Sequence, residues 1–341
     1  MAPGAIPWLA RAALPLLLRL PPEASHGLGL RGIKLLSSSW AAQATPAALA
    51  VEAFGLRFAH PVGLAAGFDK NGDYLDALGA LGFGHVEIGT VTPRPQAGNP
   101  RPRLFRLRRA QALINRMGFN NRGAEHVAAR VAGAKYRGVR GISIGKNADT
   151  PLERAVDDYL ACLRLLYGVA DYFAINVSSP NTQGLRALQA TDALGGIIEP
   201  LQEERERLAA RHGRHVPLLV KISPDLDSAA LRAMAVAVRS HALEGVIATN
   251  TSTHIAGYES ELDKAQGGGM SGAPLRSKAL AALRLLRAEL GPDIPVIGVG
   301  GLMSAADVRA RLEAGANLVQ LYTGFVYRGP ALLNECLQSL H

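Results

Sequence analysis

Short apolar runs alternate with longer amphipathic segments along most of the chain, from about residue 60 onward. We expect buried strands at residues 62–66, 85–90, 141–145, 172–177, 218–222, 245–249, 296–299 and 318–322. We expect helices at residues 74–81, 122–134, 152–167, 191–212, 228–242, 277–290, 304–314 and 330–340. Strand-then-helix units predict an α/β fold with a parallel sheet. Eight such units in about 280 residues are typical of a closed (β/α)8 TIM barrel rather than an open sheet.

The first 40 residues do not follow this alternation. Residues 6–20 are apolar but contain prolines and arginines, so they lack the roughly 20 apolar residues of a spanning helix. They also lack the basic start of a signal peptide. On a helical wheel the apolar and the other residues separate, with Ile6, Leu9, Ala13, Leu16 and Leu20 on one side and Arg11, Pro15 and Arg19 on the other.

Because Pro15 would break or kink this helix, we expect a pair of short helices, the second starting near Pro22 and running towards Leu36. A short basic amphipathic segment is typical of a helix that lies on a membrane surface, and the alternative is a helix packed on its own domain. We therefore divide the chain into a membrane-associating helical extension, residues 1–40, and a catalytic barrel domain, residues 41–341.

The net charge is +9, from 37 Lys and Arg against 28 Asp and Glu, which suits nucleic acid, an anionic membrane surface or anionic ligands. Aromatic residues make up only 5%, and the densest basic segment, residues 101–109, alternates like a hairpin strand. We interpret this segment as a solvated strand edge, and we expect no nucleic-acid binding.

The two cysteines, Cys162 and Cys336, are too few and too far apart for a disulfide framework or a metal cluster. Both lie in helical patterns, so we expect small core residues in a reducing compartment. The nine histidines show no metal-ligand spacing such as HExxH, and we expect no metal site.

Polar residues capable of chemistry follow six of the predicted strands. They are Lys70 and Asn71, then Thr90, then Lys146 and Asn147, then Asn176, Ser179 and Asn181, then Lys221, and then Thr249, Asn250 and Thr251. The carboxyl ends of barrel strands meet at one face, where active sites lie. Lys221 stands inside an apolar run, and burying a lysine is costly unless an anionic group meets it.

Glycines follow the last two predicted strands, in residues 294–301 (IPVIGVGG) and 321–324 (LYTG). Phosphate sites in barrels form in the loops after strands seven and eight, from backbone N–H groups. A flat phosphate-bearing ligand with a lysine against its ring is therefore expected, and flavin mononucleotide (FMN) fits that description.

Five motifs, in order along the chain, resemble the signatures of the dihydroorotate dehydrogenase family. They are residues 65–70 (AAGFDK), 115–119 (NRMGF), 176–182 (NVSSPNT), 248–251 (ATNT) and 271–275 (SGAPL). The resemblance runs from roughly residue 20 to the C-terminus. The helical extension and the serine at position 179 resemble the membrane-associated, quinone-reducing class 2 of the family. The soluble classes are similar in the barrel, but they lack the extension and use a cysteine as base.

The resemblance implies oxidation of (S)-dihydroorotate to orotate in pyrimidine biosynthesis. One FMN per chain would accept the hydride, and a membrane quinone would be the terminal electron acceptor. It also implies a peripheral protein on the cytoplasmic side of the inner cell membrane, and we expect a monomer. The residues implied to contact FMN are Ala66, Gly67, Phe68, Asp69, Lys70, Thr90, Ser143, Asn176, Lys221, Thr249, Gly272, Gly301, Tyr322 and Thr323.

Further roles follow from the same motifs. The residues implied to hold dihydroorotate are Lys70, Asn115, Arg116, Met117, Gly118, Phe119, Asn176, Asn181, Asn250 and Thr251. Ser179 is the implied catalytic base, and His26 and Arg106 are implied to line the quinone site. Ser143 is a departure, because the family commonly has asparagine there. Its shorter hydroxyl could still bond FMN or the substrate, through water.

The residues also bear on the chemistry. No histidine lies near Ser179 in the sequence, so we expect a closed, dry site in which a neighbouring threonine or water takes the proton onward. Asparagines suit a substrate rich in amide groups because each side chain both donates and accepts. Lys221 beside the flavin would stabilise negative charge on the reduced ring.

Four alternatives remain open. A serine hydrolase would need a Gly-x-Ser-x-Gly elbow, and no glycine flanks Ser178 or Ser179. Another FMN-dependent barrel oxidoreductase would not account for the set of asparagines. A soluble-class dihydroorotate dehydrogenase would use fumarate or NAD. A basic membrane or nucleic-acid binder without activity would leave the polar strand ends without a purpose.

Overall fold

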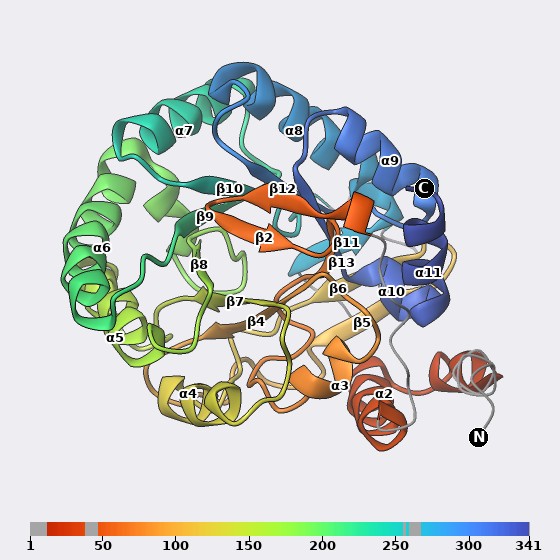
Figure 1. Ribbon diagram of the computed structural model, residues 1–341. Helices are drawn as coiled ribbons and strands as arrows, with labels where there is room; N and C mark the ends of the chain where they lie inside the picture. The colour runs from red at the N-terminus through yellow and green to blue at the C-terminus, as the bar shows by residue number, and fades with distance from the viewer. Residues whose placement is uncertain (1–11, 38–46, 255–256, 259–266, 341) are drawn as a thin grey trace.

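The protein is a closed parallel barrel ringed by helices, with a helical extension beside it (Figure 1). The computed structural model describes residues 12–37, 47–254, 257–258 and 267–340. Around the barrel the strands neighbour one another in the order β10-β12-β13-β3-β4-β7-β8-β9. In chain order they are β3 (Val62–Leu64), β4 (His85–Val91), β7 (Val139–Ile144), β8 (Tyr172–Asn176), β9 (Leu218–Ile222), β10 (Gly245–Ala248), β12 (Val296–Val299) and β13 (Leu318–Leu321).

The predicted TIM barrel is confirmed. Strands β9 and β12 have the predicted bounds, and the other six differ by one or two residues at their ends. Most of the predicted strands ran too far at the carboxyl end, where Ala65, Val177, Thr249 and Tyr322 have already left the sheet. These residues stay buried or half-buried around the site after the strands have ended. The apolar pattern is therefore longer than the strands themselves.

Helices pack on the outside of the barrel. They are α3 (Leu75–Gly79), α4 (Ala124–Ala132), α5 (Ala155–Leu166) preceded by the 3-10 turn η3 (Leu152–Arg154), α6 (Thr191–His212), α7 (Ser228–Ser240), α8 (Arg276–Leu290), α9 (Ala305–Glu313), α10 (Thr323–Arg328) and α11 (Pro330–Gln338). Helix α6 has the predicted bounds, and α10 was not predicted. Short 3-10 turns are η2 (Ala47–Leu49), η4 (Leu185–Gln189) and η6 (Ala273–Leu275).

Local sequence signals fix several helix starts. The Asp227 carboxylate accepts the backbone N–H of Ala230 at the start of α7, and the Ser304 hydroxyl accepts that of Asp307 at the start of α9. Pro330 opens α11 at the position where a missing N–H costs nothing. Asp227 and Ser304 lie in βα connections, so these caps help to fix the loops that follow β9 and β12.

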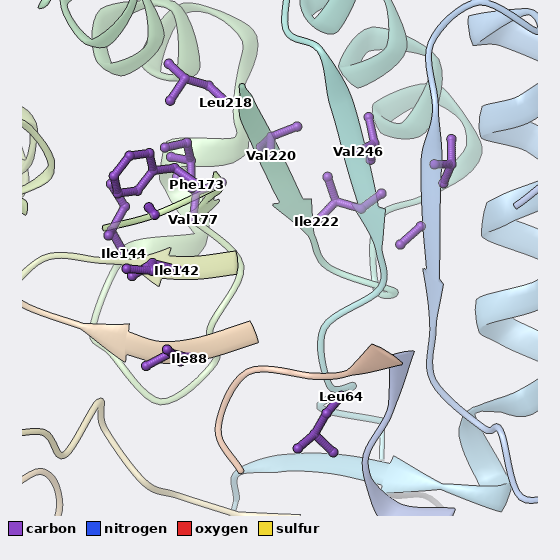
Figure 2. Packing of buried hydrophobic residues seen from close by; sticks show 14 of the residues in the cluster. Leu64, Ile88, Ile142, Ile144, Phe173, Val177, Leu218, Val220, Ile222 and Val246 are labelled. Atoms are coloured by element: carbon purple, nitrogen blue, oxygen red, sulfur yellow. The ribbon is translucent and has the colours of Figure 1, made fainter. Parts of the chain in front are cut away.

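Two cores follow from the alternation of side chains along each strand. Phe173 and Ile175 of β8 face the helices and belong to the large outer core, part of which Figure 2 shows. Tyr172 and Ala174 face into the barrel and belong to a second, smaller core. Because the strands are apolar on both faces, their sequences are nearly continuous hydrophobic runs.

A hairpin that was not predicted closes the amino-terminal end of the barrel. It consists of β1 (Val51–Ala53) and β2 (Leu56–Phe58), which pair antiparallel across the opening (Figure 1). Phe54 and Phe58 pack into the inner core, with ring centroids 6.4 Å from Tyr172 and 5.3 Å from His85, respectively. Because this hairpin fills the amino-terminal end, the carboxyl end is the accessible end of the barrel.

A second small sheet lies at the other end of the barrel. It consists of β5 (Leu104–Leu107), β6 (Ala112–Asn115) and β11 (Gly269–Gly272) in the order β11-β6-β5. The hairpin pattern predicted for residues 101–109 is therefore confirmed for β5 and β6. The sheet carries Asn115 and Gly272 to the rim of the barrel.

The extension consists of helical residues 12–17 and helix α2 (Pro22–Leu36). The predicted pair of short helices is confirmed and the second helix has the predicted bounds, but a break at Pro15 is not found, since residues 12–17 continue through it and the chain turns at residues 18–20. Ile6, Leu9 and Arg11, and the predicted boundary at residue 40, lie outside the described residues. Of the predicted apolar side, Leu16 is 64% exposed and Leu20 is 38% exposed.

The basic strand holds this extension, so the prediction of a solvated edge is wrong for two of its arginines. Arg103 is 5% exposed and donates to the Glu23 carboxylate on α2, at 2.8 Å. Arg106 donates to the backbone carbonyls of Leu18 and Leu20. Burial alone would raise the pKa of Glu23, but the hydrogen bond and charge of Arg103, with those of Arg101, lower it overall.

The two cysteines are buried in α5 and α11, as predicted. Burial raises the pKa of the Cys162 thiol well above its usual range and that of Cys336 to about 12, so both stay protonated. Within the described part of the chain, no helix combines the length and the hydrophobicity needed to cross a bilayer.

Replacing Gly63 of β3 by alanine should destabilise the barrel. An added Cβ would lie 2.2 Å from the ring of His85, which is fully buried and packed against Phe58. We expect the free energy of unfolding to fall by about 1–3 kcal/mol, the usual cost of overpacking. Urea unfolding followed by fluorescence measures this loss.

Gly196→Ala is the matched control. Gly196 lies exposed in α6, and an added Cβ would meet nothing within 4 Å. That substitution should stabilise the protein by up to about 1 kcal/mol because alanine has the higher helix propensity. An unchanged unfolding midpoint for Gly63→Ala would contradict the packing described for the barrel interior.

Candidate active site

A cavity lies at the carboxyl ends of the barrel strands, where the sequence predicted it. Its walls come from seven of the eight barrel strands or the loops after them, and from β6 and β11. The lining residues are Ala65, Ala66, Gly67, Lys70, Thr90, Asn115, Met117, Gly118, Phe119, Asn176, Ser179, Pro180, Asn181, Lys221, Thr249, Asn250, Thr251, Ser271, Gly272, Leu275, Val299, Gly300, Gly301, Leu302, Met303, Gln320, Tyr322, Thr323 and Gly324.

Four of the predicted residues lie elsewhere. The Asp69 carboxylate accepts the backbone N–H groups of Asn71, Asp73 and Tyr74, so it holds the loop before α3. Arg116 stacks on Phe105, 5.2 Å from the ring centroid. The other two are Phe68, which lines a second cavity, and Ser143, which is fully buried behind Thr90.

The asparagines of the cavity are bonded to one another in two pairs. Asn181 donates to the Asn115 side chain at 2.9 Å, and Asn115 donates to the Gly269 carbonyl. Asn250 donates to the Asn176 side chain at 3.2 Å, and Asn176 donates to the Thr90 hydroxyl. Each pair is thus fixed by hydrogen bonds from other strands, and its remaining donors and acceptors can face a ligand.

The two serines after β8 have different surroundings. Ser179 lines the cavity, is 4% exposed, and accepts the backbone N–H of Asn181 at 3.3 Å. Ser178 is fully buried, and its hydroxyl bonds the side chains of Asn176 and Asn250. Among the described lining residues there is no histidine, so the geometry gives Ser179 no partner of the hydrolase type.

Lys70 adds a positive charge at the cavity wall. Its ammonium donates to the Gly67 carbonyl at 2.7 Å. Burial, aided by the nearby Arg103, lowers the pKa of Lys70 to about 8, so the side chain is mostly charged at neutral pH. It can therefore meet an anionic group of a ligand.

The floor of the cavity contains a buried ion pair. Lys221 lies 3.2 Å from the carboxylate of Glu87 on β4, which is fully buried. The same carboxylate accepts from the Tyr172 hydroxyl at 2.9 Å and from the Gln320 amide at 2.8 Å. The predicted need of Lys221 for an anionic partner is confirmed, and the partner within the chain is Glu87.

Sequence reasoning missed Glu87 and Gln320 although the signal was present. Both are polar residues inside predicted apolar strands, which is the pattern that singled out Lys221. Strand register, which places them at one level of the barrel, is set by long-range pairing and could not be read from the sequence.

Glycines form the wall after β12 and beside β11. Gly301 has φ +74°, and a Cβ there would come within 2.5 Å of the backbone of Arg276. Gly272 has φ +100°, and a Cβ there would meet the Gln111 carbonyl at 2.3 Å. Only glycine fits these positions, because each must pack directly against another backbone segment of the wall.

Arg186 ties together three loops of the active-site face, and sequence reasoning missed it. It donates to the backbone carbonyls of Ser178 and Thr251, at 3.2 and 2.9 Å, and to the Asp225 carboxylate after β9, at 2.9 Å. Burial would raise the pKa of Asp225, but hydrogen bonds from Lys278, Ser252 and other neighbours hold that pKa well below its usual range. The loop carrying Ser179 is thus fixed by a charged network.

A second cavity lies between the extension and the barrel. Its lining residues are Ala13, Leu14, Leu17, Leu18, Pro22, Ser25, His26, Gly29, Gly32, Ile33, Leu36, Phe68, Leu104, Arg106, Leu113, Tyr322, Phe325, Val326, Gly329 and Pro330. The predicted pair His26 and Arg106 is therefore brought together in one mostly apolar space. Tyr322 lines both cavities, and its ring packs edge-on to Phe68, with centroids 5.8 Å apart.

The polar groups of the second cavity are few. His26 donates from Nε2 to the Phe68 carbonyl at 2.9 Å. Burial lowers the pKa of His26 to about 4, so the ring is neutral at neutral pH. The Arg106 Nε is buried and has no hydrogen-bond partner among the described residues. An apolar molecule with an accepting oxygen fits these groups.

A closed parallel barrel with a polar cavity at its carboxyl end and glycine-rich loops after its last strands is the arrangement of a (β/α)8-barrel enzyme. The family model of dihydroorotate dehydrogenase matches residues 48–341, and the chain belongs to this family.

Relatives agree with this assignment. The chain is 53% identical over 330 residues to a protein of Flavobacterium lutescens named dihydroorotate dehydrogenase (quinone), covering 96% of this chain and 94% of that one. It is 52% identical over 328 residues to the protein of the same name from Pseudomonas aeruginosa strain LESB58, covering 95% and 96%.

Solved structures agree as well. A crystal structure of dihydroorotate dehydrogenase from Eimeria tenella in complex with ferulenol is 35% identical, with a TM-score of 0.86 over 94% of this chain and 90% of that one. A ligand-free structure from the same organism is 36% identical, with a TM-score of 0.85 over 94% of each chain.

Arg186→Met should loosen the active-site loops without unfolding the barrel. The substitution removes the donors to the Ser178 and Thr251 carbonyls and leaves Asp225 with one cation fewer. We expect backbone amides in residues 176–182 and 249–254 to exchange hydrogen about tenfold faster, equivalent to about 1.4 kcal/mol of local opening free energy. Hydrogen exchange followed by mass spectrometry measures the rates.

Arg207→Met provides the comparison. Arg207 lies on α6 with its side chain 71% exposed, and its ion-pair partners among the described residues are Glu203 and Glu204 on the same helix. Exchange in the two loops should be unchanged in this variant. Equal exchange in both variants would mean that Arg186 does not hold the loops.

Proposed function

We propose that this protein oxidises dihydroorotate to orotate in pyrimidine biosynthesis and passes the electrons to a quinone. One observation carries the proposal. A polar cavity at the carboxyl ends of the strands and an apolar cavity beneath the N-terminal helices share a wall at Tyr322. This suits two substrates of opposite polarity that exchange electrons through a group bound between them.

FMN fits the first cavity on the chemistry of its walls. Lys221 supplies a donor at the floor, and the buried Oε1 of Gln320, which has no partner among the described residues, supplies an acceptor. When bound, FMN supplies the two-electron acceptor that the oxidation requires. The residues that would hold it are Ala66, Gly67, Lys70, Thr90, Asn176, Lys221, Thr249, Gly272, Gly301, Tyr322 and Thr323.

The remaining wall suits dihydroorotate, a ring of amide groups with one carboxylate. The side chains of Asn115, Asn181 and Asn250 both donate and accept, so they match ring N–H and C=O groups. The charged Lys70 meets the substrate carboxylate. Asn176 and Thr251 and the backbone of residues 117–119 complete the set that we assign to the substrate.

Ser179 is the base in this proposal. Loss of a proton from C5 and of a hydride from C6 leaves the C5=C6 double bond of orotate. Ser179 takes the proton at its hydroxyl oxygen, in a site that is nearly closed to water. Thr251 and Pro180, the residue after Ser179, both lie within 3.1 Å of the position that a Cβ on Gly269 would occupy. Thr251 is therefore close to Ser179, and its hydroxyl can carry the proton onward.

The second cavity is the proposed quinone site. Its aliphatic walls suit the ring and tail of a quinone, and the Arg106 guanidinium is the donor that can meet a quinone oxygen. The His26 ring gives its Nε2–H to Phe68, so its Nδ1 can accept a hydrogen bond from the quinol. Leu16, Leu28 and Leu35 are exposed on the helices of the extension and Leu20 on the turn between them, which supports contact with a membrane surface. We place the protein as a peripheral monomer on the cytoplasmic side of the inner cell membrane.

The purified protein should be yellow from one bound FMN per chain. Dihydroorotate added without oxygen should bleach the flavin absorbance, and a quinone should restore it. Turnover with quinone should exceed that with fumarate or NAD, because the second cavity is apolar. Visible absorbance and steady-state rates measure both. A colourless protein would contradict the function, and faster turnover with fumarate would contradict the class.

Ser179→Ala should retain FMN but lose most flavin reduction. General bases contribute about 10²–10⁴-fold to rate, and we expect a loss in this range in the stopped-flow rate of bleaching by dihydroorotate. Ser178→Ala is the matched control, because its hydroxyl bonds Asn176 and Asn250 and does not line the cavity. We expect less than about a tenfold loss there. Equal losses would remove the reason for choosing Ser179.

A further inference from the structure

The carboxylate of Glu87 is the centre of a polar layer beneath the cavity floor. One oxygen, Oε1, lies 3.2 Å from the Lys221 ammonium. The other, Oε2, accepts from the Tyr172 hydroxyl at 2.9 Å and from the Gln320 amide at 2.8 Å. These residues come from four different strands, β4, β8, β9 and β13, so the carboxylate joins opposite sides of the barrel.

Glu87 acts on the cavity only through its neighbours. Its side chain is fully buried and is not among the residues that line the cavity, whereas Lys221 and Gln320 do line it. A residue that holds two lining groups without touching a ligand is a positioning residue. Its effect must therefore be sought in where those groups lie and in the charge that they present.

The orientation of the Gln320 amide follows from this contact. An ionised carboxylate only accepts hydrogen bonds, so the NH₂ group of Gln320 must face Glu87. Its Oε1 is buried and has no partner among the described residues, in a side chain that lines the cavity. A buried acceptor without a partner is costly, which indicates a ligand N–H at this place.

We propose that Glu87 holds the Lys221 ammonium and the Gln320 carbonyl against the flavin ring, and that its charge limits how strongly the site favours reduced over oxidised FMN. The inference rests on the proposed function, in which FMN occupies this cavity. With Glu87 present, the pair with Lys221 is neutral overall. Without its charge, Lys221 would present an uncompensated positive charge to the ring.

The surroundings of Lys221 restrict what else could set this charge. The charged residues among the described lining of the cavity are Lys70, on the loop after β3, and Lys221 itself. From other strands of the barrel, Glu87, Tyr172 and Gln320 form the layer, and Tyr322 stands at the end of β13. Burial raises the pKa of Tyr172 well above its usual range and that of Tyr322 to about 12, so both are neutral at ordinary pH.

The test is the midpoint potential of FMN in the holoprotein as a function of pH, for wild type and Glu87→Gln. Reduced FMN is the more negative form, so an unpaired ammonium favours it. At about pH 6 we expect the ratio of affinities for reduced over oxidised FMN to rise about tenfold, which is about 30 mV for a two-electron couple.

The offset should disappear as the pH rises towards about 9. Glu87→Gln leaves the ammonium buried without a counter-ion, and a buried ammonium in that situation gives up its proton more readily as the pH rises. A curve for Glu87→Gln that coincides with that of the wild type over this range would overturn the proposal, since Glu87 would then only fill space.

Two further variants separate charge from packing. Tyr172→Phe removes one donor to the carboxylate without changing its charge, and its curve should run parallel to that of the wild type. Glu87→Asp keeps the charge, and its curve should also lack the pH-dependent offset. An offset in Glu87→Asp as large as that in Glu87→Gln would count against the role of charge.

Because Glu87→Gln leaves a buried charge unpaired, a second variant guards the test against loss of FMN or of stability. The double variant Glu87→Gln with Lys221→Met removes both charges. Its melting temperature should be closer to that of the wild type than the melting temperature of Glu87→Gln alone. No recovery would overturn the pairing. A wild-type protein that binds no FMN would instead refute the proposed function, and the two failures are therefore distinguishable.

Discussion

Closure of the parallel barrel is the constraint on which the rest of the molecule depends. Because eight parallel strands close on one another, all their carboxyl ends meet at one rim, and side chains from distant parts of the sequence meet there. The β1–β2 hairpin fills the other end. Along the barrel axis the interior therefore contains three regions. The first holds Phe54 and Phe58 of the hairpin, the second is the Glu87 layer, and the third is the ligand cavity.

The polar layer inside the barrel also explains why the floor of the cavity can be charged. A lone ammonium at that depth would lose its proton or destabilise the fold. Here Lys221 shares a carboxylate with Tyr172 and Gln320, so one buried acceptor satisfies three donors. The asparagine pairs at the cavity are held in the same way, since hydrogen bonds to neighbouring protein groups fix the orientation of each amide.

Much of this arrangement could be predicted from the sequence, because it depends on local pattern. Apolar runs located every barrel strand, and polar strand ends located most of the cavity wall. What could not be predicted depends on contacts between distant segments. Arg103 and Arg106 alternate like a solvated strand, and only the packing of α2 against β5 turns them inward. Asp69 stands in a family motif, yet its carboxylate serves the loop before α3.

The attachment of the extension has a consequence for how this protein can be handled. Helix α2 is held to the barrel partly by an ion pair between Glu23 and Arg103, and the Arg103 side chain is almost completely buried. A shortened protein that begins at the barrel would keep this guanidinium and lose its carboxylate. Removing the N-terminal helices to improve solubility would therefore destabilise the barrel itself, because Arg103 would stay buried without its counter-ion. A truncated form would need Arg103 replaced as well.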